Sequence, residues 1–355
     1  MATSFETLPI IDFRALENES TKLEALEKLK HALFNSLIEE THKALPEMFD
    51  LPDNVKQRCN MLNSPSFLGY TALGAETTAR KTDLREQFDF GSPVTQVWKE
   101  GHLPWQRLEG PSQYPNKGIE ELVTRYISEL STLSGAFLRA VAECLSLPPD
   151  TFETFLGNMH RLKFVRYPQS EPGSQGVGPH KDSTGLFTFL SQDQVGGLEV
   201  LNRSGQWISA PYIEGTFVVN VQQGFEAITG GLCPATTHRV IAPTTSTRYS
   251  VPFFQAVRLD LTLEFLKEAA VDIVRRIPTQ NVANIENVTI PSEFLSPLFS
   301  CFGEAQLRNR VISHPDVGQR WYPELYEKYS RQSLSWNGAE PTTASDLRMR
   351  NVKEK

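Results

Sequence analysis

The stretch "GPHKDSTGLFTFL", residues 178–190, runs a histidine, one spacer and an aspartate directly into an apolar, strand-like segment. An apolar strand belongs in a hydrophobic core, where an imidazole or a carboxylate is costly unless it has a partner. In an extended chain, residues two apart point to the same face. We therefore expect His180 and Asp182 to converge on one point and to supply half of a common metal site.

A third ligand has to come from elsewhere in the chain, which contains seven histidines. His238, in "CPATTHRVIAP", is the best placed because it opens another predicted strand of the same region. Two histidines and one carboxylate on one face of a metal leave positions open, as Fe(II) oxygenases require. A closed tetrahedral zinc site would instead fit a hydrolytic or structural role. Taken alone, a His-x-Asp pair is more typical of a solvated turn.

The segment "RYSVPFF" supplies a second feature of the same region. Arg248 and Ser250 lie two apart, so they share a face of a predicted strand. An arginine aimed into a β-core needs an anion, and the distal carboxylate of a dicarboxylate would accept bonds from both the guanidinium and the serine hydroxyl. Tyr167, in "VRYP", is placed to add another hydroxyl. The alternative is a buried salt bridge between Arg248 and a protein carboxylate.

Composition narrows the class of protein. The chain has 355 residues and a net charge of −7 without a basic cluster, which argues against a nucleic-acid partner. No apolar run approaches the roughly 18 residues that a membrane span needs, and the start of the chain does not resemble a secretory signal. The four cysteines lie far apart, which indicates reduced thiols and a cytoplasmic protein.

The pattern along the chain predicts a mainly β core with flanking helices. Helical spacing runs from about Thr21 to Met48 and from about Gly118 to Leu147. Short β-type segments then follow one another between 160 and 257, as in a sandwich or barrel, and helical spacing returns near Leu261. "LPIIDF", near the start, is a further strand candidate.

Taken together, these motifs resemble the isopenicillin N synthase-like superfamily of Fe(II)- and 2-oxoglutarate-dependent dioxygenases. The resemblance covers most of the chain and includes the His-x-Asp strand, the segment with the distal histidine, the Arg-x-Ser strand, and "RNRVISHPDV", which is similar to the tail of fungal-type members. It implies a double-stranded β-helix, or jelly roll. The implied regions are an N-terminal non-haem dioxygenase region at 1–115, scaffold helices at 116–158, the jelly-roll core at 159–257 and a helical extension at 258–355.

The resemblance also implies a site and an activity. Iron would be held by His180, Asp182 and His238, and 2-oxoglutarate would chelate it while its far carboxylate meets Arg248, Ser250 and Tyr167. With O₂, the enzyme would hydroxylate, desaturate or cyclise a small molecule, in specialised metabolism, and would act as a monomer. The N-terminal segment and C-terminal helices would cap the pocket. Candidate substrate contacts are Phe67, Tyr70 and Phe254.

The sequence departs from the family pattern at two places. About fifteen to twenty residues, including a strand of the main sheet, are missing between Asn35 and Ser36, which would leave an open sheet edge and lower stability and activity. Gln222 and Gln223 stand where many members have Gly-Asp, and we expect only altered packing there.

Three other functions fit the same residues. The chain could be an iron oxidase that works without 2-oxoglutarate and uses Arg248 and Ser250 to hold a substrate carboxylate. It could be an inactive homologue that binds a small molecule. It could also be a zinc hydrolase that uses the same ligands.

Overall fold

The structure is a computed structural model that describes residues 6–12, 36–78, 81–94, 97–183, 185–277 and 299–332. Residues 36–49 are helical. The further helices are α2 (Asp53–Arg58), α3 (Lys117–Cys144), α4 (Gln223–Ile228), α5 (Leu263–Arg276), α6 (Phe302–Ser313), α7 (Pro315–Trp321) and α8 (Pro323–Gln332), with 3₁₀ turns at Met61–Asn63, Pro104–Leu108 and Glu153–Phe155.

The strands form one large sheet, one smaller sheet and a short ribbon. Their bounds are β1 (Gly69–Thr71), β2 (Thr77–Thr78), β3 (Lys81–Thr82), β4 (Glu86–Gly91), β5 (Arg161–Tyr167), β6 (Gln175–His180), β7 (Gly185–Gln192), β8 (Leu198–Leu201), β9 (Trp207–Ser209), β10 (Val218–Val221), β11 (His238–Ile241) and β12 (Arg248–Ala256). The six-stranded sheet has the order β1-β4-β5-β12-β7-β10, the four-stranded sheet has the order β6-β11-β8-β9, and β2 pairs with β3. All the pairings are antiparallel.

The two larger sheets share a small apolar cluster. Val165 and Leu190 of the six-stranded sheet pack there with Val177, Val200 and Val240 of the four-stranded sheet. We call the face of the six-stranded sheet that carries Val165 and Leu190 the inner wall. Because directly opposed residues of paired strands project to one face, the inner wall can be followed across the strands from their register.

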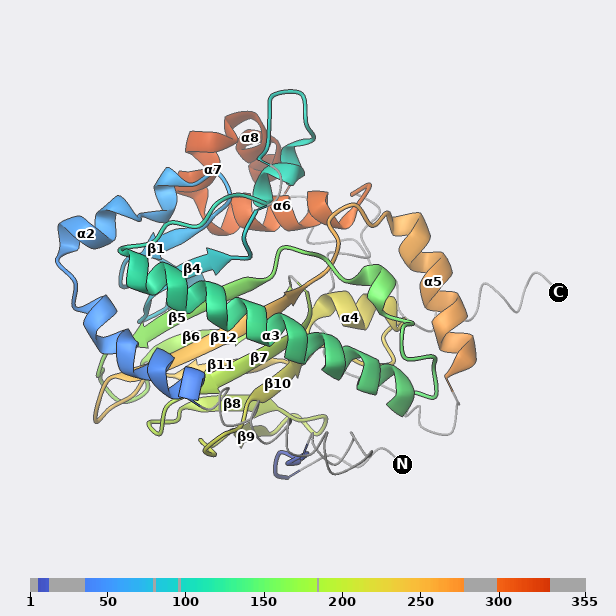
Figure 1. Cartoon of the computed structure of the whole chain (residues 1–355), viewed down its shortest axis with the longest axis horizontal. Helices are drawn as coiled ribbons and strands as arrows, with labels where there is room; N and C mark the ends of the chain where they lie inside the picture. Colours follow the sequence, from blue (N-terminus) through green and yellow to red (C-terminus); the bar gives the residue numbers. More distant parts are fainter. Residues whose placement is uncertain are drawn as a thin grey trace.

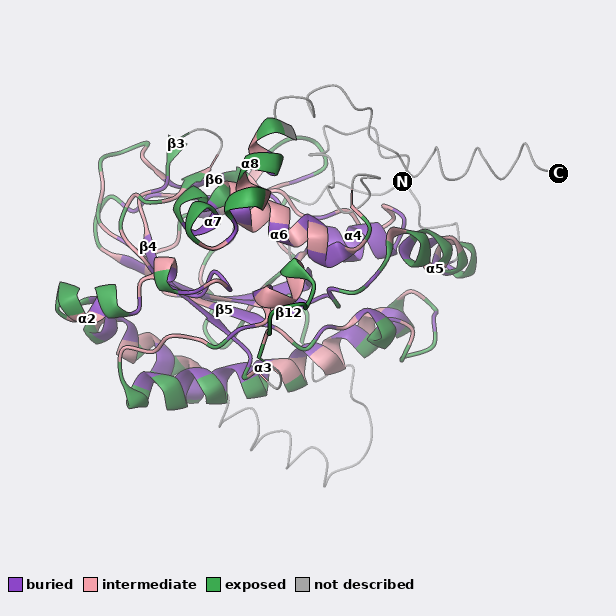
Figure 2. Cartoon of the chain, turned by 90° about the horizontal axis from the view of Figure 1, so that it is seen from above, coloured by how far each residue is buried: buried purple, intermediate pink, exposed green. Residues whose placement is uncertain are grey.

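The opposite face of the six-stranded sheet is covered by helices. Figure 2 shows α3 and the helix at 36–49 on one side of the strands and α6, α7 and α8 on the other. Asn116 caps α3 by accepting a hydrogen bond from the Ile119 amide. Phe137 of α3 meets Phe187 and Phe189 of β7 edge-on at 5.1 and 5.3 Å between ring centroids. The large hydrophobic core therefore lies between α3 and the outer face of this sheet.

The segment before β1 and the C-terminal helices close over one end of the sheets (Figure 1). The Phe67 ring stacks on Tyr322 with centroids 5.7 Å apart and meets His314 edge-on at 5.8 Å. The Trp321 indole donates to the Leu62 carbonyl at 2.9 Å, and the Tyr322 hydroxyl donates to the Pro65 carbonyl at 2.6 Å. The two hydrogen bonds join residues that lie 259 and 257 positions apart along the chain.

Two sequence expectations for the N-terminal part have different outcomes. Residues 8–12 of "LPIIDF" form no strand, and among the described residues they have no ladder partner, so the strand prediction is wrong there. The helix expected from Thr21 is described only from residue 36, and Asn35 lies outside the described residues, so the predicted gap stays a prediction. In the described sheet β10 is an edge strand, paired with β7 alone.

No helix in the described ranges combines the length and the apolar character that crossing a membrane requires. Cys59, Cys144, Cys233 and Cys301 are all free thiols, as the sequence predicts.

The buried imidazole of His160 makes the stability of the fold depend on pH. His160 accepts a hydrogen bond at Nδ1 from the Ala256 amide at 3.0 Å, and burial lowers its pKa to about 4. The usual value is about 6.5, so between about pH 6.5 and pH 4 the imidazole is protonated in the unfolded chain but neutral in the folded one, and the unfolding free energy decreases as the pH falls through this range. We expect His160→Gln, which keeps an acceptor but does not titrate, to remove this dependence.

Chemical unfolding at pH 7 and pH 4 checks this. The wild type should lose about 3 kcal/mol more of its unfolding free energy than the variant, because one pKa unit corresponds to about 1.4 kcal/mol. Equal losses in the two proteins would contradict the assignment.

Candidate metal centre

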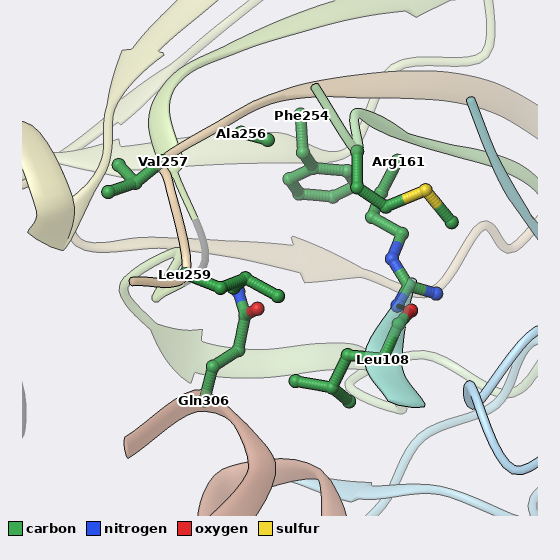
Figure 3. A pocket seen from close by; sticks show the side chains of 8 residues that line it. Leu108, Arg161, Phe254, Ala256, Val257, Leu259 and Gln306 are labelled. Carbon is green, nitrogen blue, oxygen red and sulfur yellow. Dashed lines mark hydrogen bonds between the residues drawn. The ribbon is translucent and has the colours of Figure 1, made fainter. Parts of the chain in front are cut away.

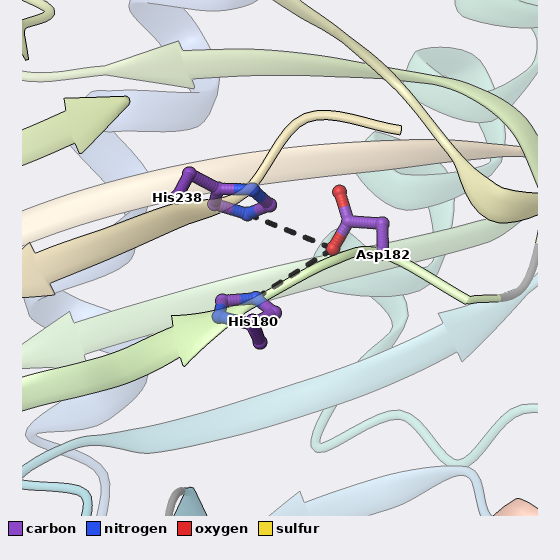
Figure 4. A group of neighbouring side chains, drawn as sticks. All are labelled: His180, Asp182 and His238. Carbon is purple, nitrogen blue, oxygen red and sulfur yellow. Dashed lines mark ion pairs between the residues drawn. The ribbon is translucent and has the colours of Figure 1, made fainter. Parts of the chain in front are cut away.

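The antiparallel register of β6 and β11 brings two histidines together. His180 is the last residue of β6, His238 is the first residue of β11, and the two are directly opposed. Their side chains therefore share a face, and the ring centroids lie 4.3 Å apart (Figure 4). His238 opens a strand, as the sequence predicts.

Asp182 joins the two histidines from the link between β6 and β7. Its Oδ1 lies 3.7 Å from Nε2 of His180 and 3.7 Å from Nε2 of His238. We expected His180 and Asp182 to share one face of a strand, and this is wrong in detail because β6 ends at His180. The carboxylate is instead turned toward the histidines by Thr188 of β7, whose hydroxyl donates to Oδ2 at 2.6 Å.

Helix α4 supports the link that carries Asp182. The Gln223 amide donates to the Asp182 carbonyl at 2.9 Å. This contact requires α4 to lie against the start of β7, where a Cβ on Gly224 would come within 2.5 Å of the Gly185 carbonyl oxygen. The preceding residue, Gln222, is fully buried, and its side chain donates to the Phe187 carbonyl at 2.8 Å. The two glutamines thus have packing roles beside the site.

Each imidazole is held with one nitrogen free for a metal. Nδ1 of His180 lies 2.8 Å from the Gly178 carbonyl, and Nδ1 of His238 lies 3.0 Å from the Thr236 carbonyl. A carbonyl accepts only, so Nδ1 carries the proton and Nε2 keeps its lone pair. Burial, followed by the neighbouring His238, lowers the pKa of His180, which favours the neutral imidazole that a metal needs.

The three ligand atoms can be bridged by one ion. One atom from each of His180, Asp182 and His238 lies within 4.8 Å of the other two. Two metal bonds of about 2.1 Å reach atoms up to about 4.2 Å apart, which covers the 3.7 Å from Oδ1 of Asp182 to each Nε2. Two imidazoles and one carboxylate on one side of an ion form the arrangement that leaves coordination positions open for non-haem Fe(II) chemistry.

A buried arginine lies on the inner wall of the same sheet system. The Arg248 side chain has no exposed area, and Nη2 donates to Oε1 of Gln192 at 3.1 Å. Nε and Nη1 are buried without a hydrogen-bond partner. Among the described residues no carboxylate forms an ion pair with Arg248, so the protein salt bridge considered from the sequence is not present in this part of the chain. An unpaired buried guanidinium is costly, and an anionic ligand would offset that cost.

Ser250 and Tyr167 flank this arginine. Ser250, 2% exposed, follows Arg248 on the same face of β12 and is opposed by Val165 and Gln192. Tyr167 is directly opposite Arg248, and its ring centroid lies 4.9 Å from the guanidinium carbon. The Tyr167 ring thus faces the guanidinium, and the predicted contact of its hydroxyl with the far carboxylate of 2-oxoglutarate stays a prediction.

The three predicted substrate contacts occupy different places. Phe254 lies on the inner wall and lines a small pocket with Arg161, Leu108, Leu259 and Gln306, shown in Figure 3. Phe67 is fully buried under Tyr322. Tyr70 packs on Phe88 at 4.9 Å and donates to Glu86 at 2.7 Å, so its side chain lies in the aromatic core on the helix-covered face.

Comparison with known proteins agrees with this geometry. Residues 156–256 match the 2OG-Fe(II) oxygenase superfamily, and residues 30–117 match the N-terminal region described as non-haem dioxygenase in morphine synthesis N-terminal. The chain is 37% identical to the 2-oxoglutarate-dependent dioxygenase frbJ of Dothideomycetidae sp., over 93% of this chain and 96% of the relative. A 2-oxoglutarate-dependent dioxygenase of Gibberella zeae is 33% identical, over 94% and 95%.

The fold is also similar to that of a solved structure, the full-length Neurospora crassa T7H in complex with alpha-KG. The TM-score is 0.58 at 21% identity, over 86% of this chain and 96% of the other. The chain belongs to the Fe(II)- and 2-oxoglutarate-dependent oxygenases. The enzyme is therefore a 2-oxoglutarate-dependent dioxygenase that uses Fe(II), 2-oxoglutarate and O₂.

Two residues of the candidate site were not predicted from the sequence. Thr188 and Gln192 lie four positions apart on the inner face of β7, where they bond to Asp182 and Arg248. In the sequence both sit inside a strand that is buried on both faces, "GLFTFLSQ". The only sequence feature that could have indicated a functional role is a polar residue within such a strand. That feature does not show which residue the polar side chain bonds to.

Thr188 orients Asp182, so its loss should weaken metal binding. We expect Thr188→Val, which removes the hydroxyl at nearly constant volume, to lower the Fe(II) affinity by about 10- to 100-fold, as loss of a hydrogen bond to a ligand does elsewhere. Thr188→Ser keeps the hydroxyl and is the matched control. Anaerobic Fe(II) titration of the three proteins measures the effect, and equal affinities for the valine and serine variants would argue against this role.

Proposed function

We propose that His180, Asp182 and His238 hold the iron of this oxygenase and that Arg248 and Ser250 hold the far carboxylate of 2-oxoglutarate, beside the ring of Tyr167. The iron and its co-substrate supply the oxidation of a substrate C–H bond by O₂. The chain supplies the ligand geometry, a water-poor pocket and the placement of that bond. The reaction is a hydroxylation, desaturation or ring closure of a small molecule of specialised metabolism.

One observation carries the proposal: two free imidazole nitrogens and one carboxylate oxygen converge in the same sheet system as a buried guanidinium that lacks an anion. A facial set of three ligands leaves positions for the two chelating groups of 2-oxoglutarate and for O₂. The guanidinium fits the remaining carboxylate, because charge-assisted bonds to Nε and Nη1 would fill both vacant donors.

The fold supports the finer assignments. An apolar cluster between two antiparallel sheets is what a double-stranded β-helix has at its centre, and we assign that fold to 159–257. Residues 1–115 and 258–355 would then cover its mouth, with 116–158 as scaffold. Four free thiols favour a cytoplasmic enzyme. We place it there as a monomer that acts on a small molecule and binds neither nucleic acid nor membrane.

Arg248→Ala tests the co-substrate site. Charge-assisted hydrogen bonds contribute about 1.5–3 kcal/mol each, so the dissociation constant of 2-oxoglutarate should rise by at least about tenfold, while Fe(II) binding stays intact. Arg239, on β11 of the four-stranded sheet, pairs with Glu199 at 2.7 Å, and its side chain points to the face opposite that of its neighbour His238, so Arg239→Ala is the control for loss of a positive charge. Anaerobic titration of the metal-to-ligand charge-transfer band gives both constants. Unchanged 2-oxoglutarate affinity in Arg248→Ala would defeat the assignment.

The ligand set has its own test. We expect His180→Ala and Asp182→Ala to abolish Fe(II) binding, the charge-transfer band and succinate release, because each removes one of three converging ligand atoms. Product formed without succinate would support the oxidase that works without 2-oxoglutarate. Turnover restored to metal-free protein by zinc and not by Fe(II) would support a hydrolase.

A further inference from the structure

A second set of buried polar groups lines the inner wall beside the proposed metal site. Gln87 and Asp89 lie two apart on β4, with exposed fractions of 1% and 0%. Gln87 is opposed by Val165 on β5, which is opposed by Ser250 on β12, so all three project to one face. Two strand spacings of about 4.8 Å place Gln87 roughly 10 Å across the wall from Ser250.

The neighbours of these two residues are charged and largely paired with one another. We call the set the inner-wall polar cluster: Glu76, Asp83, Arg85, Gln87, Asp89, Lys163 and His314. Arg85 Nη2 donates to Glu76 at 2.5 Å, and His314 Nε2 lies 3.0 Å from Oε1 of Glu76. Burial acts to raise the pKa of Glu76, but Arg85, Lys163 and His314 outweigh it and hold the pKa well below its usual range. Glu76 is therefore ionised.

The cluster reaches the metal ligands through β6. Asp83 Oδ1 accepts from the Gln175 side chain at 2.9 Å and from the Gly178 amide at 3.4 Å. The Gly178 carbonyl is the acceptor for Nδ1 of His180. The cluster and the proposed iron ligand thus share one short piece of strand.

Gln87 has a fixed orientation that leaves its carbonyl without a partner. Nε2 donates to Glu76 Oε1 at 3.0 Å and to Asp89 Oδ2 at 2.7 Å. Both partners are carboxylates, which only accept, so the amide nitrogen must face them and Oε1 must point elsewhere. Oε1 is buried without a hydrogen-bond partner.

Asp89 lies beside Gln87 and is paired on one side only. Lys163 Nζ forms an ion pair with its Oδ1 at 3.1 Å, and a carboxylate oxygen can accept a second hydrogen bond. Arg161, further along β5, is occupied by the carbonyls of Ser66 and Leu108. The buried Gln87 Oε1, left empty, costs about 1–3 kcal/mol, so a ligand that donates a hydrogen bond to it would stabilise the wall. Arg85 Nε is the one vacant donor of the described cluster and would take an acceptor on the same molecule.

We propose that Gln87 Oε1 and Asp89 Oδ1 bind a cationic nitrogen of the substrate, an ammonium or a guanidinium group. Both atoms can only accept hydrogen bonds, so they favour a nitrogen that donates, and the Asp89 carboxylate favours one that is positively charged. The inference rests on the proposed function, because the metal and 2-oxoglutarate would occupy the adjoining part of the wall. The substrate class is then a small amine or guanidine compound.

The test uses the full chain loaded with Fe(II) and 2-oxoglutarate under anaerobic conditions. The probes are L-arginine, L-lysine and agmatine, with the uncharged counterparts L-citrulline and L-norleucine and the acidic L-glutamate, and binding is followed by the shift of the charge-transfer band and by calorimetry. At least one cationic probe should bind tenfold or more tightly than its uncharged counterpart. Tighter binding of L-glutamate, or no preference for any cation, would overturn the proposal.

Two variants separate direct binding from a loss of packing. Asp89→Asn should weaken the preferred cationic probe by tenfold or more and leave the uncharged counterpart nearly unchanged. Lys163→Met breaks the same ion pair but keeps the carboxylate, so it should retain or tighten cation binding. If both variants bound the cationic probe equally weakly, the loss would come from breaking the ion pair between Asp89 and Lys163. That result would overturn the proposal. Absence of the 2-oxoglutarate band in the wild type would instead count against the proposed function.

Discussion

The pairing of β6 with β11 is the constraint on which the site depends. It sets His180 directly opposite His238, and the centroids of the two imidazoles lie 4.3 Å apart. Everything else near the site adjusts to that register. Thr188 turns the Asp182 carboxylate toward the pair, and α4 holds the link that carries Asp182. A register slip of one residue would turn one histidine to the other face, so the site is specified by the ladder of main-chain hydrogen bonds.

The six-stranded sheet has an apolar outer face and a partly polar inner wall. Its outer face carries Phe88, Phe164 and Phe253 into the helix-covered core, while its inner wall carries Gln87, Arg248 and Ser250. Both faces are buried, so β4 is closed to solvent along its whole length. Polar groups can be kept inside because most of them are paired, and the vacant atoms of Arg248 and Gln87 on the inner wall are the places where we propose that ligands bind.

The sequence predicted the parts that follow from local patterns. His238 at the start of a strand and Arg248 two positions before Ser250 could be read from residue spacing, since a strand has a period of two. The position of Asp182 in a link could not, because nothing in the sequence marks the end of β6. The polar wall was missed for a different reason. Gln87 and Asp89 sit in "EQFDFG", where alternation with phenylalanine is typical of a strand with a solvent-facing side. Only the folded structure shows that this side of the strand is buried.

The stacking of Phe67 on Tyr322 has a consequence for how the protein is made. The inner wall is complete once β12 ends at Ala256, but its cover arrives with the last helices of the described chain. Synthesis runs from the N-terminus, so the helices that carry Tyr322 are made after all the strands of both sheets. Contacts that span so much of the chain close slowly, since loop entropy is lost before they form. We therefore expect the stacking of Phe67 on Tyr322 to form late in folding.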